Sequence, residues 1–126
     1  MNLNYLISAK AGYFQIELKG TIAKEDVTEA VRNLLQTSGY YHGAPVIWVT
    51  TEADLSNIDL DTINQAVKEI DSMLEGLTIG LIALVTEKSI NASIVMLFKE
   101  IYNKNVVSVF DSLERAEKWI LSKKLA

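Results

Sequence analysis

The chain has 126 residues, of which 49% are hydrophobic, and its 12 basic and 16 acidic residues give a formal net charge of −4. This charge supplies no basic surface for phosphate groups, so we expect no nucleic-acid partner, and the absence of cysteine excludes disulfides, thiol catalysis and thiolate metal sites. Because the chain shows no signal peptide and no run near the ~18 apolar residues of a membrane-spanning helix, we expect a single cytoplasmic domain over residues 1–126.

The first part of the sequence predicts a β-hairpin followed by a helix. Leu3–Ala9 and Tyr13–Lys19 are two strand-like runs joined at Gly12, and the second alternates apolar and polar residues. Such alternation is typical of a strand with one buried face. A helix is expected from Lys24 to about Thr37, with Gly39 as its left-handed stop.

Two apolar strands are expected in the middle of the chain, separated by a helix. Val46–Thr50 is the first, and the helix runs from Asp59, a good N-cap, to about Glu75. The second strand, Thr78–Thr86, is apolar in a continuous run, which is typical of an interior strand covered on both faces. The helix shows an apolar stripe at spacings of three and four, formed by Leu60, Ile63, Val67, Ile70, Leu74 and Leu77.

The last third predicts a helix, a strand and a final helix. The helix spans about Ile90–Tyr102, the strand is Val106–Phe110, and Asp111 and Glu114 open the final helix with the spacing of a capping box. The order β-β-α-β-α-β-α-β-α therefore predicts an α/β fold. We expect a single mixed, mostly parallel five-stranded sheet with an N-terminal hairpin and four helices.

In open α/β sheets, ligands bind beyond the carboxyl ends of the strands. There this sequence gathers hydroxyls and carboxylates, which predict either an anion or polar-ligand site or ordinary helix caps and solvated loops. The acidic members show no fixed ligand spacing, so we expect no metal and no cofactor. The candidate residues are Thr50, Glu52, Asp54, Asp59, Thr86, Ser89 and Asp111.

The sequence gives no sign of catalysis. The single histidine, His42, precedes a strand, whereas Ser89 and Ser112 follow strands, so the three lie at opposite ends of the sheet. This arrangement excludes a Ser-His-Asp triad. We therefore expect no catalytic residue and no enzymatic activity.

The helix near Ile90–Tyr102 is apolar around most of its girth. A helix of this kind is normally covered on two sides. Beyond the stripe expected against the sheet, Val95, Met96 and Tyr102 add further apolar surface. These three residues predict an association face, with scattered exposed apolar residues as the alternative.

The segment Asp54-Leu55-Ser56, followed by a spacer and Asp59, resembles a signature of the STAS domains. That family includes the anti-sigma-factor antagonists, whose signature is Asp-Leu-Ser, a short spacer and Asp-Ser-Ser-Gly. Through Gly20, Ile82–Val85 and the end of the chain, the resemblance extends over nearly the whole sequence to the divergent SpoIIAA-like, or STAS/SEC14, branch. It implies a non-catalytic module, similar in fold to lipid-carrying CRAL-TRIO domains.

The sequence departs from this signature where the antagonists carry their phosphoacceptor serine. Leu60-Asp61-Thr62 stands in place of Ser-Ser-Gly, so that position falls on Asp61. A serine kinase cannot switch an aspartate. The resemblance therefore implies a regulatory protein–protein interaction module without the serine phospho-switch, acting with a protein partner or as a homo-oligomer. The alternative is a carrier or sensor of an apolar or lipid ligand, associated with a membrane surface.

Overall fold

The computed structural model describes residues 4–87, 89–102 and 106–124. Over these residues the strands and helices alternate in the order predicted from the sequence. They are β1 (Tyr5–Lys10), β2 (Tyr13–Thr21), α1 (Lys24–Leu35), β3 (Val46–Asp54), α2 (Leu60–Met73), β4 (Ile82–Val85), α3 (Ser89–Tyr102), β5 (Val107–Phe110) and α4 (Leu113–Lys124).

The strands form one five-stranded sheet in the order β1-β2-β3-β4-β5. β1 is antiparallel to β2, with Tyr5 opposite Leu18, and the remaining neighbours are parallel. A helix connects each strand to its parallel neighbour, because parallel strands need a crossover of about a dozen residues or more. The predicted mixed, mostly parallel α/β sheet with an N-terminal hairpin is confirmed.

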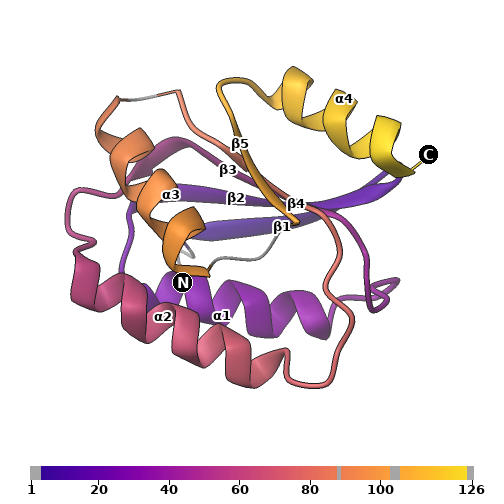
Figure 1. Ribbon diagram of the computed structural model, residues 1–126, viewed down its shortest axis with the longest axis horizontal. Coiled ribbons are helices and arrows are strands. Elements are labelled where there is room, and N and C mark those ends of the chain that lie inside the picture. Colours follow the sequence, from indigo (N-terminus) through magenta and orange to yellow (C-terminus); the bar gives the residue numbers. More distant parts are fainter. Residues whose placement is uncertain (1–3, 88, 103–105, 125–126) are drawn as a thin grey trace.

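The helices cover the two faces of the sheet unequally. In Figure 1, α1, α2 and α3 lie on one side of the strands and α4 lies alone on the other. The larger core therefore lies beneath three helices and includes Ile16 and Leu84, while Ile47 and Val85 pack with Ile120 of α4. Side chains of adjacent strand residues thus enter different cores, which explains why the middle strands are apolar on both faces.

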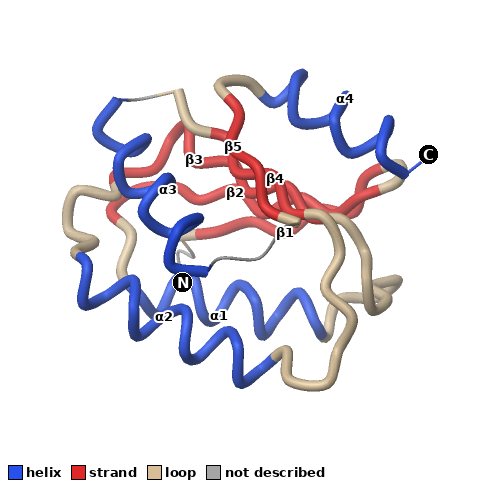
Figure 2. Tube along the Cα trace, in the orientation of Figure 1, coloured by secondary structure: helices blue, strands red, loops and turns tan. Residues whose placement is uncertain are grey.

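Two strand boundaries differ from those expected by four residues, and the other differences are smaller. β4 begins at Ile82 rather than Thr78, because the preceding residues pass beside the loop that enters β3, as Figure 2 shows at the right. The amide of Val46 donates to the carbonyl of Leu81 at 2.9 Å in this region. β3 extends to Asp54 rather than Thr50, because its last residues pair with the end of β2.

The association face predicted on α3 is wrong for two of its three residues. Val95 and Tyr102 are only 5% and 4% exposed, whereas Met96 is 45% exposed. The buried side of α3 passes through Asn91, Val95 and Tyr102, because the helix packs against both α2 and the sheet. An almost uniformly apolar helix has no clear polar face from which its orientation could be predicted.

Candidate functional site

The carboxyl ends of the strands that carry the predicted polar site are staggered. Val49 of β3 lies opposite Val85 at the end of β4, yet β3 continues to Asp54. Thr50 is buried and donates its hydroxyl to the carbonyl of Val85 at 2.8 Å. Thr86 is also buried, and its amide donates to the carbonyl of Phe110.

The exposed members of the predicted polar site serve separate local roles. Asp54 accepts a bond from the amide of Ser56 at 2.9 Å, and Asp111 lies 3.5 Å from Arg115. Ser112, not Asp111, caps α4 by accepting the amide of Arg115 at 3.2 Å. Glu52 is solvent-exposed, and the side chain of Ser89 lies outside the described residues.

Neither a metal centre nor a membrane span is found in the described part of the chain. No three His, Cys, Asp or Glu residues in this part are grouped so that they could hold a metal ion. No helix in the same residues is both long enough and apolar enough to cross a membrane.

Asn91 is a functional candidate that the sequence reasoning missed. It is fully buried, and its amide group ties α3 to the segment that leaves β3. Its Nδ2 donates to the carbonyls of Thr50 at 3.2 Å and Ala53 at 2.9 Å, while its Oδ1 accepts the amide of Leu55 at 3.2 Å. These bonds satisfy backbone groups that would otherwise be buried without partners, and they fix the start of the β3–α2 loop.

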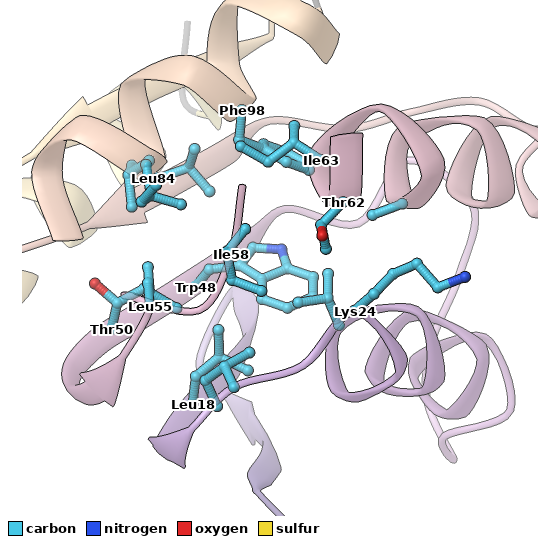
Figure 3. A pocket seen from close by; sticks show the side chains of 15 residues that line it. Leu18, Lys24, Trp48, Thr50, Leu55, Ile58, Thr62, Ile63, Leu84 and Phe98 are labelled. Carbon is cyan, nitrogen blue, oxygen red and sulfur yellow. The ribbon is translucent and has the colours of Figure 1, made fainter. Parts of the chain in front are cut away.

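An apolar cavity of about 90 Å³ lies between the sheet, the β3–α2 loop and the three helices of the larger core. Figure 3 shows the Trp48 indole in its middle, with Lys24 extending away at one side. The polar residues at its edge are Lys24, Thr50 and Thr62, and the remaining lining is apolar. Those residues are Leu18, Ile22, Val27, Trp48, Leu55, Ile58, Ile63, Ala66, Leu84, Ile94, Val95 and Phe98.

A polar depression of about 340 Å³ adjoins this cavity and also involves Ile22, Lys24, Ile58 and Thr62. These shared residues place the mouth of the cavity between the start of α1 and the β3–α2 loop. A second cavity of about 60 Å³ shares two aromatic residues with the first, Trp48 and Phe98. The rings of Trp48 and Phe98 therefore form a wall that the two cavities share, on the same face of the sheet.

The first turn of α2 combines charge with an exposed apolar side chain. Asp59 is the N-cap, and one of its oxygens accepts the amide of Thr62 at 2.8 Å and its hydroxyl at 2.7 Å. These hydrogen bonds lower the pKa of the Asp59 carboxyl, with the Thr62 hydroxyl as the larger cause. Asp61 accepts a bond from Gln65 at 2.7 Å, and Leu60 between the two carboxylates is 54% exposed.

The start of α1 lies beside this turn and is linked to α2 by an ion pair. The Lys24 ammonium donates to Glu69 at 2.8 Å, and this bond raises the pKa of Lys24 and lowers the pKa of Glu69. Asp26 accepts the amide of Ala23 at 2.8 Å, which satisfies one open donor at the helix start. The cation nearest the cavity mouth is therefore already engaged by a carboxylate.

Comparison with solved structures shows what this arrangement resembles. The chain matches the anti-sigma factor antagonist SpoIIAA in its unphosphorylated form with a TM-score of 0.54, over 94% of this chain and 96% of that chain, at 11% identity. The chain has a STAS-like fold. Neither protein-family models nor curated proteins give a match to the sequence.

Within this STAS-like fold, Asp61 lies where the sequence resemblance places the phosphoacceptor position, in the first turn of α2. Its carboxylate is exposed, and the positive end of the α2 dipole stabilises the negative charge. The predicted phosphoacceptor equivalence itself rests on the short sequence match. The structure adds that this position is accessible and adjoins exposed Leu60.

We expect the Asp59→Ala variant to be less stable than the wild type at neutral pH, by an amount that shrinks in acid. The hydrogen bonds from Thr62 favour the carboxylate, so the pKa in the folded protein is below the ordinary value of 3.8. Stability from this group is therefore present above that value and is lost as the pH falls through the lower, folded-state pKa. Melting temperatures of both proteins across this range measure the difference, and Asp59→Asn, which keeps a capping oxygen, is the control.

A difference in melting temperature that stayed constant, or grew, as the pH fell would contradict this role for Asp59. Equal destabilisation by Asp59→Asn and Asp59→Ala at neutral pH would show that the capping oxygen itself is unimportant. Either result would remove the physical reason for the fixed geometry of the first turn of α2.

Proposed function

We propose that this protein is a non-catalytic, STAS-like regulatory module that binds a protein partner through the first turn of α2, without a serine phospho-switch. The observation that carries this proposal is the exposed side chain of Leu60 between Asp59 and Asp61, at the helix start of a SpoIIAA-like fold. An exposed aliphatic residue flanked by charges suits a reversible interface, with an apolar contact inside a polar rim.

The carboxylate at Asp61 gives this proposed interface a constant charge. In the antagonists that the sequence resembles, this position carries a serine that is phosphorylated. Here the negative charge needs no kinase, so partner binding would follow the concentration of the partner or another signal. The proposed role is therefore constitutive binding.

Two pairs of ionisable side chains with altered pKa values lie far apart in the fold, which supports a non-catalytic role. Tyr13 donates to Glu117 at 2.7 Å on the α4 side of the sheet, and burial and this carboxylate raise its pKa to about 12. The hydrogen bond between Lys24 of α1 and Glu69 of α2 raises the pKa of the lysine and lowers the pKa of the glutamate. These pairs lie on different faces of the sheet, so they do not form the convergent acid and base of a hydrolytic or transfer site.

A second candidate function, a carrier or sensor of an apolar ligand at a membrane surface, is favoured by the two apolar cavities. Their volumes of about 90 and 60 Å³ are small, and Trp48 and Phe98 stand between them. A ligand longer than a few carbon atoms would need both rings to move. A native mass spectrum of freshly purified protein distinguishes this function by a retained apolar ligand, and it reports homo-oligomers at the same time.

We expect the Leu60→Asp variant to lose a partner that the wild-type protein captures from the lysate of its source cells. The change removes the apolar contact and would bury a carboxylate against the apolar part of the partner, which is costly, while the exposed position leaves folding intact. Affinity capture followed by mass spectrometry measures the loss. The matched control is Leu121→Asp on α4, since Leu121 is 41% exposed on the opposite side of the sheet.

A partner that binds the wild type and the Leu121→Asp variant but not Leu60→Asp would support the proposed interface. Equal capture by all three proteins would contradict it. If Leu121→Asp alone lost the partner, the interface would lie on the α4 face. Homodimers that survive in the Leu60→Asp variant would show that self-association uses another surface.

A further inference from the structure

We infer that the 90 Å³ cavity is the receptor for one branched aliphatic side chain, presented by a basic segment of the partner protein. This inference rests on the proposed function, because it names the chemistry of the partner that the first turn of α2 would bind. It adds three features to that surface: a cavity, the partner side chain that fills the cavity, and a preference for basic partner residues.

The volume of the cavity sets the size of the occupant. At about 90 Å³ it exceeds the ~30 Å³ that a water molecule occupies in the liquid, and an apolar lining offers water too few hydrogen bonds. It is smaller than the ~150 Å³ apolar cavity that admits benzene. The branched side chain of leucine or isoleucine matches this range, whereas an indole ring or a long acyl chain does not.

The mouth of the cavity adjoins the proposed interface. Ile58 and Thr62 line both the cavity and the polar depression outside it, and they flank Leu60 in the sequence. The same short segment therefore supplies Leu60 and two residues at the mouth, and we place one partner segment over both. Interfaces commonly gain most of their affinity from such an anchor, which a ring of polar contacts shields from water.

The charge around the mouth selects a basic partner. The segments 21–26 and 54–65 contribute residues to the lining of the depression, with Glu25 as the lining carboxylate. The one cation in these two segments is Lys24, whose ammonium is bound to Glu69. Carboxylates dominate the same segments, and this field attracts lysine and arginine and repels fatty acids and anionic lipid head groups. They are Glu25, Asp26, Asp54, Asp59 and Asp61. A protein segment with basic residues on both sides of its anchor is therefore favoured over a lipid.

The test uses a displayed library of random short peptides selected on the wild-type protein. Ala66 is 5% exposed on α2 and lines the cavity, so Ala66→Leu fills the space from one side. Val27 of α1 also lines it, and Val27→Leu fills it from another. We expect enriched peptides to carry an aliphatic residue between lysines or arginines. Their affinity should fall at least about tenfold in both filled variants and in Leu60→Asp, and stay unchanged in Leu121→Asp.

The outcomes separate this inference from the proposed function. Peptides that lose affinity for Leu60→Asp but bind both folded, filled variants normally would overturn the cavity anchor and leave the proposed interface intact. Peptides that bind Leu60→Asp as tightly as the wild type would overturn both the cavity anchor and the proposed interface. A selection that yields no binders would do the same. Acidic enriched sequences would overturn the charge preference, and a lipid retained in the native mass spectrum would overturn a protein occupant. Thermal melts establish that each variant is folded, and two independent filling sites keep the test decisive if one variant unfolds.

Discussion

Replacing Asn91 with leucine is expected to lower the free energy of unfolding by about 2–5 kcal/mol, because buried backbone groups lose their hydrogen-bond partners. Asn91 is fully buried and bonds to the amide of Leu55 and the carbonyls of Thr50 and Ala53. Leucine has a similar size but can neither donate nor accept. Denaturant unfolding of the variant and the wild type measures the loss.

The matched control is Asn64→Leu, since Asn64 is exposed on α2 and should tolerate leucine with little change. Asn91→Asp tests the donor separately, because a carboxylate still accepts the amide of Leu55 but cannot donate to two carbonyls. We expect this variant to be destabilised as well. An Asn91→Leu protein as stable as the Asn64→Leu control would show that these three bonds contribute nothing net to folding.

The same substitution connects stability to the proposed binding surface. Asn91 fixes Leu55 at the start of the β3–α2 loop, and that loop leads through Ile58 to the Asp59 cap. Losing this anchor should speed hydrogen exchange at the amides of Leu55 and Ile58 before the whole domain unfolds. The position of the cavity mouth therefore depends on a residue of α3, which is distant in the sequence.

Much of the architecture could be predicted because it follows from local patterns. Tyr13–Lys19 alternates apolar and polar residues, and the turn at Gly12 is short, so an antiparallel hairpin is the simplest pairing. Val46–Thr50 and the apolar run before Thr86 lack this alternation, which implied helices on both faces. Connections that contain helices made the later strands parallel, as the structure shows.

The orientation of α3 could not be predicted from its composition. Ile94 and Ile101, which belong to the stripe expected against the sheet, do pack on the larger core but are only half-buried. The most buried positions include a polar residue, Asn91, together with Val95. Only the three-dimensional position of the end of β3 reveals that a buried amide is needed there, because those carbonyls come from a distant segment.

Leu60 shows a related limit on what a helical pattern can establish. It falls on the apolar stripe of α2 by spacing, and the sequence reasoning placed it with Ile63 and Val67. Those two residues are buried, yet Leu60 is 54% exposed. Periodicity gives the direction in which a side chain points, but not whether another element lies opposite it. The candidate interface therefore became visible only in the structure.

The strand ends that carry the predicted polar site are not level with one another, for a geometric reason. The sequence expectation ended β3 near Thr50, level with the end of β4. Pairing with β2 instead carries β3 on to Asp54, so its acidic residues lie beyond the residue that pairs with the end of β4. A strand continues as long as its neighbour offers hydrogen bonds, and polar side chains do not end it.

Replacing Gly80 with valine is expected to lower the free energy of unfolding by about 3 kcal/mol, the upper end of the usual cost of overpacking. A Cβ at this position would overlap the carbonyl of Gly43 and lie 2.7 Å from the carbonyl oxygen of Ala44. A glycine within an apolar, strand-like run usually marks the close approach of a helix or backbone, and at Gly80 the neighbour is backbone. Gly80 itself precedes β4 instead of lying within a strand.

Because the obstacle is backbone, rotating a side chain cannot relieve it, and Gly80→Ala should be destabilised as well. Gly76 supplies the contrast, since it has a φ of +79° and nothing within 4 Å of an added Cβ. Asparagine tolerates the left-handed conformation, so Gly76→Asn should be milder than Gly76→Ala, whereas Gly80→Asn should be no milder than Gly80→Ala. Denaturation midpoints of the four variants measure this pattern. A Gly80→Ala midpoint equal to that of the wild type would mean that the loop before β3 moves aside at no cost, and the close backbone contact would not hold β3 and β4 in register.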